Sequence, residues 1–134
     1  MATGGTGGYD RDALLEFLVG YGLALGAGDL EGLSSRFDLP ALLVAQEETV
    51  LVTTPEDVLR LSRERPTASA ARESVATVPE VTSIEEVGWG LLWVEVRWSY
   101  RDEYAAQVAS ERSRYLLRRG RGTFEVCVVV PVPD

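Results

Sequence analysis

The chain has 134 residues, a formal charge of −8, 46% hydrophobic residues and 25% charged residues. These values are typical of one globular domain with a single core, and the acidic charge argues against nucleic acid or anionic membranes as partners, because both are bound through Lys and Arg. With no histidine and only one cysteine, Cys127, the sequence excludes Ser/His and Cys/His catalytic pairs, histidine-based metal sites and an intrachain disulfide.

The chain opens with a segment that should not fold. Residues 1–8 include four glycines and two threonines, which predicts a disordered tail and places the single folded domain at residues 9–134. An amphipathic helix is predicted next, with Asp10 as its N-cap and Gly28 as its stop. Its apolar residues follow one helical face at positions i, i+3, i+4, i+7 and i+11: Leu14, Phe17, Leu18, Tyr21 and Leu25.

Two shorter helices are predicted after the first. Asp29 is a suitable N-cap for the second helix, which should end at the Asp-Leu-Pro step of residues 38–40. Its apolar residues are Leu30, Leu33 and Phe37. The third helix should begin with Thr54 as N-cap and Pro55 in the first helical position, and should end before Pro66.

The other segments predict β-structure. The expected strands are Leu42–Gln46, Val50–Thr53, Ser74–Val87, Gly90–Arg101, Tyr104–Arg119 and Thr123–Pro131, with a hairpin between the first two and a Gly-rich turn at residues 120–122. One face of Gly90–Arg101 carries Leu92, Val94, Val96, Trp98 and Tyr100. Helices followed by a strand meander indicate an α+β domain with an antiparallel sheet.

These elements resemble the nuclear transport factor 2-like superfamily, which includes ketosteroid isomerases and SnoaL-like polyketide cyclases. The resemblance lies in Tyr21, the Ala-Gly-Asp-Leu step of residues 27–30, Leu33, Phe37 and the late strand of residues 114–119. It implies an α+β cone, in which a strongly curved antiparallel or mixed sheet wraps around three N-terminal helices and leaves an open-ended pocket. It also implies frequent homodimerisation through the outer face of the sheet, where Trp93 and Arg97 are expected.

The resemblance further implies where the catalytic groups of a ketosteroid isomerase would lie. Tyr21 matches the tyrosine of the oxyanion hole, but the position of the base falls on Ala45 and that of the protonated acid falls on Ser113. Neither residue supplies the required carboxyl group, which argues against the isomerase reaction. An isomerase or cyclase of another arrangement would use Tyr21 with Glu47 or Glu111 as base.

Three functional hypotheses follow. The first is a small-molecule-binding domain whose apolar ligand contacts Tyr21, Val96, Trp98, Ser113, Tyr115 and Val126. The second is the enzyme just described, and the third is a dimeric accessory or scaffold protein whose cone is filled by Leu92, Trp98, Tyr115 and Phe124. No cofactor, metal, nucleic acid or membrane partner is expected. The single cysteine and the lack of a secretion signal predict a cytoplasmic protein.

Overall fold

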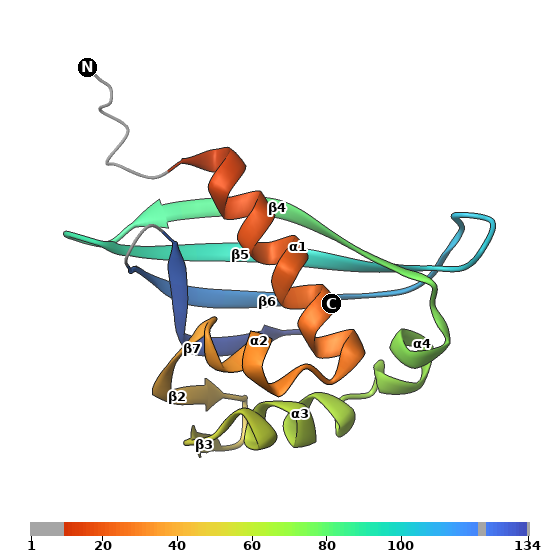
Figure 1. Ribbon diagram of the computed structural model, residues 1–134, viewed down its shortest axis with the longest axis horizontal. Coiled ribbons are helices and arrows are strands. Elements are labelled where there is room, and N and C mark those ends of the chain that lie inside the picture. The colour runs from red at the N-terminus through yellow and green to blue at the C-terminus, as the bar shows by residue number, and fades with distance from the viewer. Residues whose placement is uncertain (1–9, 121–122, 134) are drawn as a thin grey trace.

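The computed structural model describes residues 10–120 and 123–133 (Figure 1). The tail predicted at residues 1–8 and part of the turn predicted at residues 120–122 lie outside the described residues. The described helices are α1 (Arg11–Ala27), α2 (Leu30–Ser34), α3 (Pro55–Arg63) and α4 (Ala68–Glu73). The described strands are β2 (Phe37–Val44), β3 (Thr49–Val52), β4 (Ala76–Glu86), β5 (Leu91–Arg101), β6 (Gln107–Arg119) and β7 (Phe124–Val132).

The strands form one mixed sheet in the order β3-β2-β7-β6-β5-β4. The contact between β2 and β7 is parallel, and the other neighbours pair antiparallel. Register shifts interrupt the β2–β7, β4–β5, β5–β6 and β6–β7 pairs, and such irregularities bend strands. Helix α1 crosses one face of the sheet, and α2, α3 and α4 continue along the same side (Figure 1). The predicted α+β class with a curved, mixed sheet is confirmed, and the sheet is not closed.

Helix α1 has both of its predicted ends. The Asp10 carboxylate accepts hydrogen bonds from the backbone N–H groups of Asp12, at 2.9 Å, and Ala13, at 3.3 Å. At the other end Gly28 adopts the left-handed conformation, with φ 65°, and its N–H donates to the carbonyl of Leu25 at 3.3 Å. Four of the five predicted apolar residues are buried, and Leu25 packs against them. Local sequence signals therefore define this helix fully.

Two glycines near the end of α1 should respond oppositely to alanine. A Cβ at Gly26 meets nothing within 4 Å, so Gly26→Ala should raise the free energy of unfolding by about 0.8–1 kcal/mol through helix propensity. Gly28→Ala should lower it by about 1–2 kcal/mol, because L-residues resist a positive φ. Urea denaturation of both variants measures the difference. Stability changes of the same sign would contradict this account of the C-cap.

Helix α3 begins with the predicted capping box. The Asp57 N–H donates to the Thr54 hydroxyl at 3.2 Å, and the Thr54 N–H donates back to the Asp57 carboxylate at 3.3 Å. The helix ends at Arg63, before Pro66 as predicted. Helix α4 was not predicted, because its six residues are too few to show a helical period and the β-structure was expected to begin at Ser74.

The predicted second helix was too long. It ends at Ser34, and Phe37 is the first residue of β2 instead of its last apolar contact. Phe37 pairs with Val126 of the parallel neighbour β7, and the N–H of Val126 donates to the carbonyl of Arg36 at 2.8 Å. A strand from Phe37 satisfies these backbone groups through β7, a non-local pairing that residues 29–40 do not reveal.

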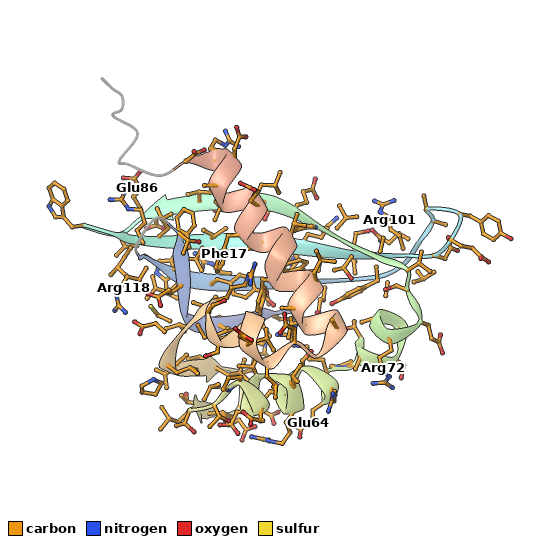
Figure 2. The ribbon with its side chains drawn as sticks, in the orientation of Figure 1. Phe17, Glu64, Arg72, Glu86, Arg101 and Arg118 are labelled. Carbon is orange, nitrogen blue, oxygen red and sulfur yellow. The ribbon has the colours of Figure 1, made fainter. Side chains whose placement is uncertain are left out.

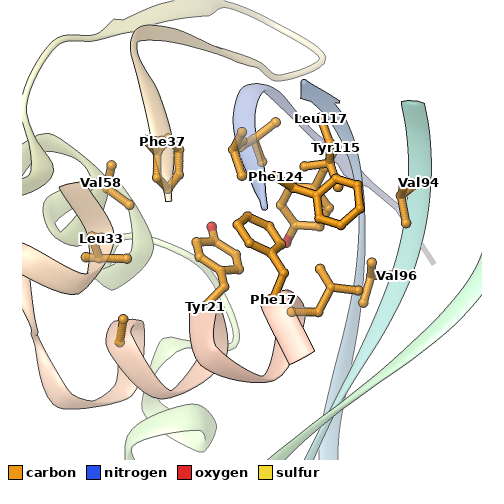
Figure 3. Packing of buried hydrophobic residues seen from close by; sticks show 14 of the residues in the cluster. Phe17, Tyr21, Leu33, Phe37, Val58, Val94, Val96, Tyr115, Leu117 and Phe124 are labelled. Atoms are coloured by element: carbon orange, nitrogen blue, oxygen red, sulfur yellow. The ribbon is translucent and has the colours of Figure 1, made fainter. Parts of the chain in front are cut away.

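The core fills one part of the cone with aromatic and branched side chains. Phe17 and Tyr21 point from α1 towards Tyr115 and Phe124 of the sheet (Figure 3). Phe17 contacts Phe124 with ring centroids 5.8 Å apart, and Tyr21 contacts Tyr115 at 5.7 Å. The four residues predicted to fill the cone, Leu92, Trp98, Tyr115 and Phe124, are all buried. The cone is therefore packed along most of α1.

Candidate functional site

Beyond this packed region the cone opens into a cavity of about 690 Å³. Its walls come from the second half of α1, from α3 and α4 with the turn between them, from the start of β4, and from the inner faces of β5 and β6. Apolar side chains on the walls include Leu23, Leu25, Leu59, Ala71 and Val75. A cavity of this volume is in the range of small-molecule sites.

The cavity wall depends on a glycine in α1 and on a turn between two helices. A Cβ at Gly22 would lie 3.1 Å from Cζ3 of Trp98, so the glycine lets α1 approach the indole closely. In the turn, the N–H of Arg65 donates to the carbonyl of Ser62 at 3.4 Å, and the N–H of Ala68 donates to the carbonyl of Arg65 at 3.0 Å. Both helices thus hold the Arg65 backbone in place.

Glu111 of β6 is the centre of a polar cluster on the cavity wall. Its Oε1 accepts from Arg65 Nη1 at 2.8 Å and from the Tyr100 hydroxyl, and its Oε2 accepts from Thr67 Oγ1 at 2.8 Å. The side chains of Arg65 and Glu111 are only 20% and 16% exposed. A buried carboxylate needs such partners, and here they connect the α3–α4 turn with β5 and β6.

A second set of polar contacts lies deeper, among aromatic rings. The indole N–H of Trp98 donates to the Tyr115 hydroxyl at 2.8 Å, and the rings of Tyr21 and Trp98 lie 5.9 Å apart, centroid to centroid. Burial raises the pKa of Tyr21 and of Tyr115. For Tyr100, burial and then its hydrogen bond to Glu111 raise the pKa. The three buried tyrosines are therefore neutral hydrogen-bonding groups at physiological pH.

These tyrosines should make the protein lose stability in alkali. Because their pKa values are raised by folding, their contribution is complete below the unfolded pKa of about 10 and is lost as the pH rises above it. The sequence has no lysine, so few other side chains titrate in this range. Urea denaturation between about pH 8 and 11, in a Cys127→Ser background, should show this loss. The Tyr115→Phe variant should show a smaller slope, and an equal slope would contradict the assignment.

The six residues predicted to bind a ligand occupy three different environments. Trp98 and Tyr115 line the large cavity. Tyr21 is 2% exposed and lines only a smaller space of about 30 Å³, which Arg65 also borders. The remaining three are buried in the core and line neither space: Val96, Ser113 and Val126. Their roles in ligand binding stay predictions.

The two candidate bases, Glu47 and Glu111, lie in different environments. Glu47 is exposed in the turn between β2 and β3, where Ala45 also lies. Glu111 lines the large cavity, but three protein donors already occupy its carboxylate. The structure thus brings one of the two candidate carboxylates to the cavity.

Sequence reasoning missed Arg65, Thr67 and Tyr100 as site residues. Tyr100 had a usable signal, because it shares the inward face of its strand with Trp98. Arg65 and Thr67 had none, since a polar residue after a helix end is ordinarily solvated. Their inward positions depend on the unpredicted helix α4.

Two further properties of the described residues bear on the type of site. Among residues 10–120 and 123–133, no three His, Cys, Asp or Glu side chains are grouped so as to hold a metal ion. Within the same ranges no helix has the length and apolar character needed to cross a bilayer.

Comparison with known proteins gives a family and a fold. The sequence model of one family, described as NTF2-like protein (DUF6841), matches residues 12–134. Among solved structures, an NTF2-like protein from Cytophaga hutchinsonii is 19% identical, with 95% of this chain and 100% of that chain covered and a TM-score of 0.64. An NTF2-like protein of unknown function from Silicibacter pomeroyi is 15% identical, with 98% of each chain covered and a TM-score of 0.64. No curated protein matches the chain.

Proposed function

The chain belongs to the DUF6841 family of NTF2-like proteins, and on that premise we propose that it is a small-molecule-binding protein without the ketosteroid isomerase reaction. The observation that carries the proposal is the open cavity of about 690 Å³, which combines apolar walls with the polar cluster around Glu111. A mostly apolar cavity with a few convergent polar groups is the usual form of a ligand site. The Silicibacter pomeroyi protein is described as of unknown function and the Cytophaga hutchinsonii protein only as NTF2-like, so neither description suggests a particular ligand.

The cavity also bears on the third hypothesis, a scaffold with a filled cone. Leu92 and Phe124 do fill the inner part, as that hypothesis requires, but Trp98 and Tyr115 border the large open space. Side chains that only stabilise a scaffold would be expected to leave few voids. The cavity therefore favours binding over a filled cone.

The enzymatic alternative is supported by Glu111 alone. The hydrogen-bond partners of Glu111 among the described residues are Arg65, Thr67 and Tyr100 and do not include Tyr21, and Glu47 lies in an exposed turn. A direct test is deuterium uptake at the carbon next to the carbonyl of a flat cyclic ketone, followed by NMR. We expect the same uptake with the protein and with its Glu111→Gln variant, and faster uptake with the unmodified protein would favour the enzyme.

Ligand binding is tested by thermal shift with flat polycyclic and acyl compounds, followed by calorimetry on those that stabilise. A true ligand at a hundred times its Kd should add about 2.7 kcal/mol of stability. Ala71→Trp should abolish this gain by filling the cavity, whereas Ala106→Trp in the exposed β5–β6 loop should leave it unchanged. Equal stabilisation of both variants would place binding outside the cavity, and no stabilisation by any compound would contradict the proposal.

Homodimerisation through the outer face of the sheet stays a prediction. On that face Arg97 is exposed, and the guanidinium of Arg114 lies over the Trp93 ring, 5.4 Å from its centroid. This cation–π contact already covers part of the indole within one chain. Sedimentation of the protein and of an Arg97→Glu variant tests the dimer, which the substitution should weaken.

The cytoplasmic location also stays a prediction.

A further inference from the structure

The lining of the large cavity has a positive net charge, whereas the whole chain has a negative one. The chain carries a formal charge of −8, yet the cavity lining includes three arginines and one glutamate: Arg63, Arg65, Arg72 and Glu111. Arg63 and Arg72 are exposed, whereas Arg65 is largely buried. Figure 2 shows Arg72 at the α3–α4 end of the molecule, far from Glu86 and Arg118 at the opposite end. The local charge therefore favours an anion in an otherwise acidic protein.

Arg65 retains hydrogen-bonding capacity towards the cavity. A guanidinium has five N–H donors, and the side chain of Arg65 donates one hydrogen bond, to Glu111. None of its nitrogens is both fully buried and unpaired among the described residues, so donors without a protein partner have solvent access, and Arg65 is part of the cavity wall. Because Glu111 and the α3–α4 turn hold the side chain, this group is oriented before a ligand arrives.

Glu111 has less hydrogen-bonding capacity left for a ligand than Arg65 has. Its two oxygens accept from Arg65, Thr67 and Tyr100, so a ligand donor would have to compete with protein donors already in place. Among the described residues that line the cavity, the only charged acceptor is thus already bonded, whereas Arg65 keeps charged donors without a protein partner. A ligand with a negatively charged acceptor would satisfy them, and carboxylates match the fork of a guanidinium.

Resting on the proposed ligand-binding function, we infer that the ligand is an organic acid whose carboxylate binds the guanidinium of Arg65 and whose apolar body lies against Leu23, Leu59, Ala71 and Val75. Glu111 is a positioning residue that holds Arg65 through its hydrogen bond. Arg63 and Arg72 at the exposed rim add to the attraction without fixing the carboxylate. The donor-rich wall should reject a ligand of the same shape that lacks the charge.

The test compares matched pairs of compounds by calorimetry: decanoate with decanamide, and naphthylacetate with naphthylacetamide. At least one acid should bind at least about tenfold more tightly than its amide, since a hydrogen bond between charged groups is stronger than one to a neutral amide. Equal affinities within each pair would overturn the inference and leave the proposed function standing. If no compound from these pairs or from the wider screen bound, both would fail.

Variants assign the preference to Arg65. The double variant Arg65→Gln/Glu111→Gln removes both charges and should lose the preference for the acid while keeping the affinity for the amide. Arg65→Lys keeps the buried charge but not the fork, and should reduce the preference, which gives a second measurement if the double variant does not fold. Arg60→Gln, an exposed arginine on α3 that does not line the cavity, is the matched control and should change nothing. A preference that survived in both Arg65 variants and disappeared in Arg63→Gln/Arg72→Gln would overturn the assignment.

Discussion

Replacing Glu111 with alanine should lower the free energy of unfolding by about 3 kcal/mol, the lower end of the cost of removing one partner from a buried ion pair. The lower end applies because Arg65 and Glu111 keep 20% and 16% exposure. The loss comes from three donors left without their acceptor, on Arg65, Thr67 and Tyr100. Urea denaturation, with the transition followed by tryptophan fluorescence, measures it.

Two comparisons isolate the cause of this loss. Glu111→Gln keeps an acceptor and the side-chain volume, so its loss should be smaller. Glu64→Ala removes an exposed glutamate whose Oε2 lies 3.7 Å from Arg60 Nη1, and should change stability by less than about 0.5 kcal/mol. A loss for Glu111→Ala below about 1 kcal/mol would show that the cluster is a solvated ion pair and not a buried network.

Replacing Trp98 with alanine should cost about 3–5 kcal/mol, as is usual when a large aromatic side chain is removed from a core. Trp98 is 3% exposed, contacts the ring of Tyr21 at a centroid distance of 5.9 Å, and donates its indole N–H to Tyr115. The substitution would merge its volume with the ligand cavity and leave the Tyr115 hydroxyl without that donor. Thermal and urea denaturation should both report the loss.

The control is a second tryptophan that lies outside the strands. Trp89 lies at the turn between β4 and β5 and is 99% exposed, so Trp89→Ala should alter stability by less than about 0.5 kcal/mol. Trp98→Phe keeps an aromatic ring but loses the N–H and part of the indole volume, and should cost less than Trp98→Ala. If Trp98→Ala were as mild as Trp89→Ala, the packed part of the cone would not extend to the edge of the cavity.

The fold places stability and binding in adjoining parts of one cone. Phe17, Leu92 and Phe124 fill one part, while the other part is left open between α1 and α4. Trp98 and Tyr115 belong to both, since they are buried in the core and also border the cavity. Substitutions at these two residues should therefore affect stability and binding together, whereas Ala71→Trp should affect binding alone.

The sequence by itself determined the elements that depend on nearby residues. Asp10 and Gly28 mark the two ends of α1, and Thr54 and Asp57 mark the start of α3. Caps and helical periods can be recognised because they involve residues only a few positions apart. Alternation along β5 likewise placed Trp98 and Tyr100 on the inner face. The family resemblance, which rests on the order of such elements, is confirmed by the family match.

Only the tertiary structure decided what the cavity contains. Arg65 and Glu111 are 46 positions apart, and Thr67 and Glu111 are 44 apart, so their contact depends on how α4 and the turn before it pack on β6. Phe37 was assigned to a helix for the same reason, because its partner Val126 lies in the last strand. Long-range pairing has no local signal, since each residue alone is compatible with solvent or with a different element.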